Sequence, residues 1–163
     1  MRKIKAEPLT AEAFAPYGTF SDGLNPKGYH LSGEYHKFYR DQAKFYSESN
    51  LPIGLSPLAV RAHGYQVTGV EWHTHTCEGM IPLNDDAVMH VSLASGDFDP
   101  EQTKAFIVPK GTVITIYPGV YHLTPLPVHE EQLNALILLP ERAYANDFLY
   151  KDLDEDSQFE IEL

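Results

Sequence analysis

The sequence of 163 residues has one cysteine, Cys77, and no apolar run near the roughly 18 residues that a membrane-spanning helix needs. A single cysteine cannot form an intrachain disulfide, which is typical of a reducing compartment, so we expect a cytoplasmic protein. The N-terminus MRKIKAEPLT is basic at first, but no apolar segment follows, which argues against a signal peptide. Only 12 Lys and Arg stand against 23 Asp and Glu, and this net charge of −11 disfavours nucleic acid and anionic membrane surfaces as partners.

The sequence also lacks a P-loop, a dinucleotide-binding glycine fingerprint and a Gly-x-Ser-x-Gly elbow. Its 12 Pro and 11 Gly exclude long helices. From residue 59 onward, short segments rich in β-branched and aromatic residues alternate with turn residues. This pattern predicts a mainly β fold, a sandwich or closed barrel, with strands at 59–63, 65–72, 78–83, 86–93, 105–108, 112–117, 120–124 and 133–139.

We expect one domain over residues 1–163, with the barrel core at 59–139. Residues 9–17 predict a short helix that Thr10 caps and Pro16 ends, and residues 140–151 predict a terminal helix. The segment 152–163 has six acidic residues and no Lys or Arg, which favours a solvated acidic tail. Its alternating apolar residues allow a final edge strand instead.

Aromatic residues are concentrated between residues 29 and 46, within the loop-rich segment 1–58 that precedes the barrel core. There are too many of them for a solvated loop, so we expect this segment to pack on a sheet or on a partner subunit. Closed two-fold assemblies are the commonest, so the sequence predicts a homodimer.

Metal-ligand chemistry is suggested by the segment EWHTHTCEGMIPL at residues 71–83. His73 and His75 are two residues apart, which on a strand places both imidazoles on one face. Glu78 follows three residues later and could return to the same centre. A mixed nitrogen and oxygen ligand set of this kind suits a divalent transition metal such as Zn, Mn, Fe, Ni or Co. Cys77 is a possible soft ligand, but we favour a packing role for it.

A fourth candidate ligand, His122, follows the Pro118-Gly119 turn in GTVITIYPGVYH at residues 111–122. A histidine just after such a turn can point into the mouth of a barrel. The other five histidines have no partner in the sequence and are expected to be hydrogen-bonded residues of the fold: His30, His36, His63, His90 and His129.

The spacing His73-x-His75 with Glu78, followed by Gly111, Pro118-Gly119 and His122, resembles the two motifs of the cupins. A resemblance over more of the chain is to the ureidoglycolate lyase family. It rests on PLTAEAFAPYG at residues 8–18, on AFIVPKG at 105–111, and on two groups of single residues: Glu71, His73, Glu78, Met80, Ile81 and Pro82, then Gly119, Tyr121, His122 and Pro125.

This resemblance implies a cupin-type β-barrel (jelly roll), commonly dimeric, that eliminates urea from ureidoglycolate to give glyoxylate. The expected substrate is therefore a small carboxylate. The metal would be held by His73, His75, Glu78 and His122. Glu78, if it is not a ligand, or Glu71 would be the catalytic base. Arg61 would pair with the substrate carboxylate, although a structural role for it is equally compatible with the sequence.

Other functions fit the same residues. The predicted metal ligands could serve a dioxygenase or a sugar isomerase, because this fold supports many chemistries. A non-catalytic module that binds a small molecule is a third possibility.

Overall fold

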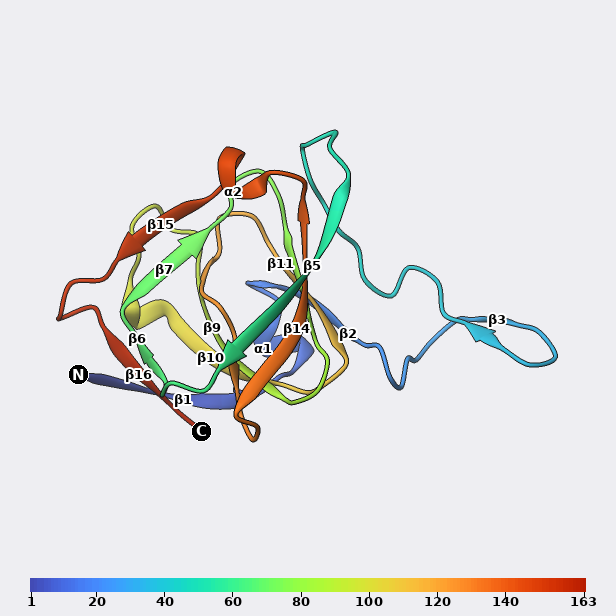
Figure 1. The fold of residues 1–163 in the computed structure, drawn as a ribbon, viewed down its shortest axis with the longest axis horizontal. Coiled ribbons are helices and arrows are strands. Elements are labelled where there is room, and N and C mark those ends of the chain that lie inside the picture. Colours follow the sequence, from blue (N-terminus) through green and yellow to red (C-terminus); the bar gives the residue numbers. More distant parts are fainter.

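A computed structural model describes all residues, 1–163, and shows two sheets that curl around a common core (Figure 1). The larger sheet has nine strands in the order β15-β7-β12-β9-β10-β1-β16-β6, with β13 paired to β9. Its strands are β1 (Arg2–Pro8), β6 (Gln66–Val67), β7 (Gly69–Trp72), β9 (Ala87–Ser92), β10 (Thr103–Val108), β12 (Tyr121–His122), β13 (Leu126–Pro127), β15 (Leu149–Asp152) and β16 (Phe159–Glu162).

The smaller sheet has five strands, all antiparallel, in the order β2-β11-β8-β14-β5. These are β2 (Gly18–Asp22), β5 (Ile53–Arg61), β8 (Glu78–Pro82), β11 (Thr112–Ile116) and β14 (Gln132–Pro140). Alternate residues of β14 are buried, starting at Leu133, as expected for a strand with one face on the core. Buried residues from both sheets form one apolar cluster, so the predicted mainly β barrel is confirmed.

The predicted N-terminal helix is present as α1 (Ala11–Phe14). The hydroxyl of Thr10 accepts a hydrogen bond from the backbone N–H of Ala13 at 3.2 Å, as expected for an N-cap. Phe14 is fully buried and its ring lies edge-on to that of Phe106, with centroids 5.5 Å apart. The helix is thereby fixed to β10. A single 3-10 turn, η1 (Pro100–Gln102), precedes that strand.

The predicted terminal helix at 140–151 is much shorter than expected. Only α2 (Ala143–Asn146) is helical, and β15 begins after the two residues that follow it. Arg142, at the N-cap position, has a left-handed backbone and provides no side-chain cap. Leu149 and Tyr150 instead pair with β7, where they complete backbone hydrogen bonding at a sheet edge.

The acidic C-terminal segment is not a solvated tail. Its final strand, β16, lies between β1 and β6, and Phe159 and Ile161 are buried in the core. The acidic residues that alternate with them, Glu160 and Glu162, are on the other face of the strand, where Glu162 forms an ion pair with Lys3 at 2.6 Å. The alternation of apolar and acidic residues therefore determined the structure here, because one face of the strand could be buried while the charges stayed in water.

Residues 24–46 form an extension that we call the arm, which contains the short strands β3 (Leu31–Ser32) and β4 (Lys37–Phe38). It projects away from the barrel (Figure 1), and no residue of it belongs to the core cluster. The expectation that this segment packs on the protein's own sheet is therefore wrong. Packing on a partner subunit stays a prediction.

None of the helices has the length and apolar character required to cross a membrane.

Candidate metal centre

Three buried side chains meet inside the barrel, and we call them the triad: His73, Glu78 and His122. Glu78 belongs to β8 of the smaller sheet, His122 to β12 of the larger sheet, and His73 directly follows β7. One Glu78 oxygen, Oε2, lies 3.0 Å from Nε2 of His73 and 3.3 Å from Nε2 of His122. The three residues are only 2%, 7% and 2% exposed, so the cluster joins the two sheets within the core.

The backbone fixes which nitrogen each histidine turns toward the centre. Nδ1 of His73 is hydrogen-bonded to the carbonyl of Asp147, and Nδ1 of His122 to the carbonyl of Val120 at 2.9 Å. Each Nδ1–H donates to a carbonyl, so Nε2 is the nitrogen that faces Glu78 and that could bind a metal ion. Metal-binding histidines are held in this way, so the two imidazoles and one carboxylate fit a divalent transition metal.

Within the triad, the effect of the neighbouring charges on each pKa is opposite to the effect of burial. Burial alone would raise the pKa of Glu78, but the charges and hydrogen bonds of His122 and His73 outweigh it and lower that pKa to about 2. Burial would lower the pKa of His122, but the Glu78 carboxylate raises it above its usual value. Glu78 is therefore an anion that is partly neutralised by its neighbours, as a metal ligand or the centre of an ion pair must be.

Glu71 lies on β7 directly opposite His122, to which it is paired in the sheet. Burial raises the pKa of Glu71, and the charge of Glu78 adds to this, while His122 acts in the opposite direction. The two glutamates of the site therefore differ: Glu78 stays ionised, whereas Glu71 binds a proton more readily. Such a difference between neighbouring carboxyl groups is typical of acid and base catalysis.

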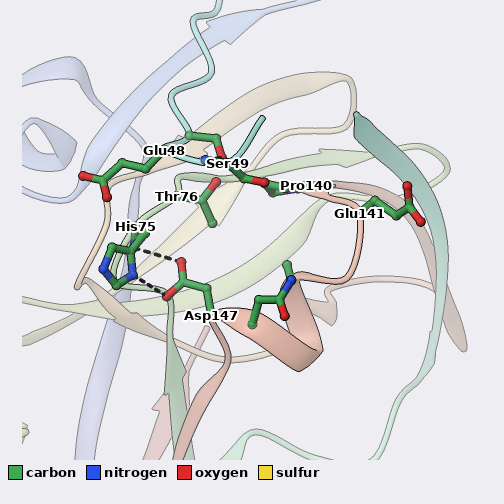
Figure 2. A pocket seen from close by; sticks show the side chains of 10 residues that line it. Glu48, Ser49, His75, Thr76, Pro140, Glu141 and Asp147 are labelled. Atoms are coloured by element: carbon green, nitrogen blue, oxygen red, sulfur yellow. Dashed lines mark hydrogen bonds and ion pairs between the residues drawn. The ribbon is translucent and has the colours of Figure 1, made fainter. Parts of the chain in front are cut away.

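His75 lies outside the triad. The strand β7 ends at Trp72 and the chain bends at residues 74 and 75, so the two imidazoles do not share a strand face. The side chain of His75 is 63% exposed, and its Nδ1 lies 3.3 Å from Oδ1 of Asp147 (Figure 2). The structure therefore brings together three of the four candidate ligands.

Asp147 holds the bend at residues 74 and 75 in place. Its carboxylate accepts hydrogen bonds from the backbone N–H of Thr74 at 2.7 Å and of His75 at 2.8 Å, and from the Thr74 hydroxyl at 2.8 Å. Because the carbonyl of Asp147 also binds His73, one residue fixes both the bend and the orientation of a triad imidazole. No sequence pattern linked it to His73, which is 74 positions away.

Two aromatic residues lie beside His73 of the triad. The rings of Tyr144 on α2 and of Phe148 lie 6.5 Å and 6.3 Å from that of His73. Burial and the charges of Glu78 and Glu71 raise the pKa of Tyr144 to about 12, so its hydroxyl keeps its proton. Sequence reasoning missed Tyr144, because nothing in its neighbourhood marks it as part of a site.

A pocket of about 240 Å³ lies beside the bend, outside the triad (Figure 2). It is lined mainly by polar residues, among them Ser47, Glu48, His75, Thr76, Glu141 and Asp147. The chain that leaves the arm forms one wall, because Ser47 forms a β-bridge with Thr76. The root of the arm, the pocket and the triad are therefore connected through residues 73–78.

Arg61 is exposed and far from this region. It pairs with Gln132 at one end of β14, whereas Pro140 at the other end leads into α2. At about 3.3 Å per residue, the eight steps between them separate Arg61 from that end by roughly 26 Å. Its predicted pairing with a substrate carboxylate at the triad is therefore not supported.

Cys77 and His90, which the sequence analysis assigned to the fold, are both buried. Cys77 is buried and its N–H donates to the carbonyl of Tyr46 at 2.9 Å, which fits the packing role expected for it. His90 is buried on β9 against Phe159, and its Nε2 has no hydrogen-bond partner. The prediction that His90 is hydrogen-bonded is thus wrong for that nitrogen.

The fold and the triad together define the class: a β-barrel protein with a candidate metal centre enclosed between its two sheets. The sequence profile of the family described as "Ureidoglycolate lyase" matches residues 1–160, and the chain belongs to this family.

A ureidoglycolate lyase of Mesorhizobium japonicum is 32% identical over 133 residues, which are 77% of this chain and 80% of that protein. One of Rhodobacter capsulatus is 28% identical over 132 residues, which are 78% of this chain and 81% of that protein. Bacillus subtilis oxalate decarboxylase matches 67% of this chain at 18% identity, with a TM-score of 0.45, and the match spans 27% of the decarboxylase chain.

Proposed function

We propose that this protein is a ureidoglycolate lyase, which eliminates urea from ureidoglycolate and releases glyoxylate. The observation that carries the proposal is the family match over residues 1–160. The dioxygenase, the sugar isomerase and the non-catalytic binding module are not favoured by this match.

Ureidoglycolate carries a carboxylate, a hydroxyl and a ureido nitrogen on one carbon. Elimination breaks the O–H bond of the hydroxyl and the C–N bond to the ureido group. A C=O bond and a new N–H bond form in their place. One proton must therefore leave the hydroxyl oxygen and one must reach the departing nitrogen.

Glu71 is the proposed group that moves this proton. The raised pKa of Glu71 makes it a stronger base than Glu78. It takes the proton from the hydroxyl and delivers a proton to the nitrogen, so that it ends the reaction unchanged. Tyr144, which stays protonated, donates a hydrogen bond that orients the substrate under α2.

The metal would be held by Nε2 of His73, Nε2 of His122 and an oxygen of Glu78. A divalent transition metal bound there would supply Lewis-acid stabilisation of negative charge that develops on the substrate oxygens. In this proposal Glu78 is a ligand and Glu71 is the base. The identity of the metal is left to elemental analysis.

The products distinguish this proposal from other ways of consuming the substrate. Purified protein incubated with ureidoglycolate should form urea and glyoxylate in equal amounts, with no ammonia. Formation of ammonia in place of urea would assign a hydrolytic reaction to the site and overturn the proposal.

We also propose that the protein is a homodimer in which the arm contributes to the interface. Tyr35, Tyr29 and Phe38 on the arm are 90%, 69% and 57% exposed, which is typical of aromatic side chains at an interface. Light scattering at micromolar concentration should give twice the chain mass of 18.3 kDa. A mass near that of one chain would contradict the dimer.

A further inference from the structure

Apart from the metal that it would hold, the triad offers no Lys or Arg that could bind the carboxylate of the proposed substrate. The ion pairs of the triad are those of Glu78 with His73 and His122, and no Lys or Arg pairs with any of the three. Arg61 lies at the far end of β5, as described above. A carboxylate that enters this region would meet Glu71 and Glu78, both of them acidic.

The arm has the opposite charge. Residues 24–46 contain four of the 12 Lys and Arg of the chain but only two of its 23 Asp and Glu. The rest of the molecule is correspondingly more acidic. The arm is also pre-organised: the guanidinium of Arg40 lies over the ring of Tyr29 at 5.5 Å, and the rings of His30 and Tyr39 are in tilted contact with centroids 4.8 Å apart. An arm that is basic, ordered and not packed on its own barrel is suited to bind an acidic protein surface.

A second copy of this chain offers such a surface next to its own triad. The pocket beside the bend has the exposed acidic residues Glu48 and Glu141 on its walls, together with the carboxylate of Asp147. The arm is anchored at the same place, because Glu48 N–H donates to the carbonyl of His75 at 3.0 Å. A two-fold dimer in which the arms cross near their roots would bring each arm past the pocket of the other copy.

We propose that the arm of each copy packs over the pocket of its partner in the homodimer, and that Arg40 of one copy binds the substrate carboxylate at the triad of the other. An arginine is suited to this because its planar guanidinium binds a carboxylate through two parallel hydrogen bonds. This inference rests on the proposed lyase function for the identity of the ligand, and on the arm for the partner. Each active site would then be built from residues of two chains.

Complementation between two inactive variants tests the shared site. Arg40→Ala removes the cation and His122→Ala removes a triad ligand, so each variant alone should lose most urea release. In a dimer of the two, one site combines the intact triad of the first chain with the intact arm of the second. Random mixing at equal amounts makes half of the dimers mixed, with one complete site in two, so about a quarter of the wild-type activity should return. Mixed dimers that stay inactive, while wild type is active, would overturn the inference.

Binding of glyoxylate, measured by calorimetry, separates this inference from the lyase proposal. Arg40→Ala should weaken glyoxylate binding about 10- to 100-fold, because a charge-assisted bidentate pair is lost. Arg40→Lys should restore part of it, and Lys110→Ala, which removes an exposed cation outside the arm, should change nothing. A wild-type protein that binds glyoxylate but releases no urea would contradict the lyase alone. Unchanged glyoxylate binding in Arg40→Ala, or a wild-type protein that is monomeric in light scattering, would contradict the role of the arm.

Discussion

His73 and His75 are only two residues apart, but we expect only the removal of His73 to weaken metal binding. His73→Ala deletes one of the three donor atoms of the triad, so metal affinity should fall by more than the roughly 10- to 100-fold that loss of a supporting residue costs. His75→Ala removes an exposed imidazole outside the triad and should leave the metal content at the wild-type level.

The two variants should also differ in stability. Removal of one partner from a buried ion pair costs about 3–5 kcal/mol, and we expect the lower end for His73→Ala because His122 still pairs with Glu78. His75→Ala loses only an exposed contact with Asp147, which is worth about 0–1 kcal/mol. Unfolding in urea in the presence of chelator measures these differences without a contribution from the metal.

Elemental analysis of protein purified without chelator gives the metal content of both variants. Loss of metal from His75→Ala with full occupancy in His73→Ala would refute the assignment of ligands. Equal occupancy in wild type and His73→Ala would refute the triad as a metal site.

Three further outcomes are expected. Glu78→Gln should weaken metal binding and retain partial urea release, since the amide keeps an acceptor oxygen but loses the charge; full occupancy and unchanged turnover would remove Glu78 from the site. Asp147→Asn should lower metal affinity about 10- to 100-fold, because its carboxylate holds the bend that directly follows His73; an unchanged affinity relative to the exposed control Asp154→Asn would contradict this positioning role. His90→Leu should make the protein more resistant to acid. Burial and the charge of His122 lower the pKa of His90 to about 3, so the unfolded chain takes up a proton below pH 6.5 that the folded chain refuses. The free energy of unfolding should therefore fall by about 1.4 kcal/mol per pH unit more in wild type than in the variant. Parallel curves from denaturant titrations between pH 6.5 and 4 would contradict it.

The barrel was predictable because its signals are local. Alternating apolar residues and turn residues at regular spacing predicted most strands of the core, and Thr10 marked the start of α1. The acidic final segment shows where local reasoning fails. Its charge favoured solvent, but pairing of β16 with β1, more than 150 residues away, buries Phe159 and Ile161. The alternation of apolar residues allowed a strand there, but no local pattern shows that its partner is β1.

The candidate site, too, could be predicted only in part from the sequence. The sequence indicated His73 by its spacing from His75, Glu78 as an acid three residues further on, and His122 by its position after the Pro118-Gly119 turn. It could not show that β7 stops at Trp72, since that end depends on a carboxylate from Asp147 that binds the following bend. The position of His75 outside the triad follows from this tertiary contact.

The initial rate of urea release from ureidoglycolate, measured on metal-loaded protein with His122→Ala as the reference, tests the central claim most directly. The wild-type protein should release urea and glyoxylate in equal amounts, and His122→Ala, which removes a triad ligand while the barrel remains folded, should reduce the rate to that of the uncatalysed reaction. A folded, metal-loaded wild-type protein that releases urea no faster than His122→Ala would contradict the account.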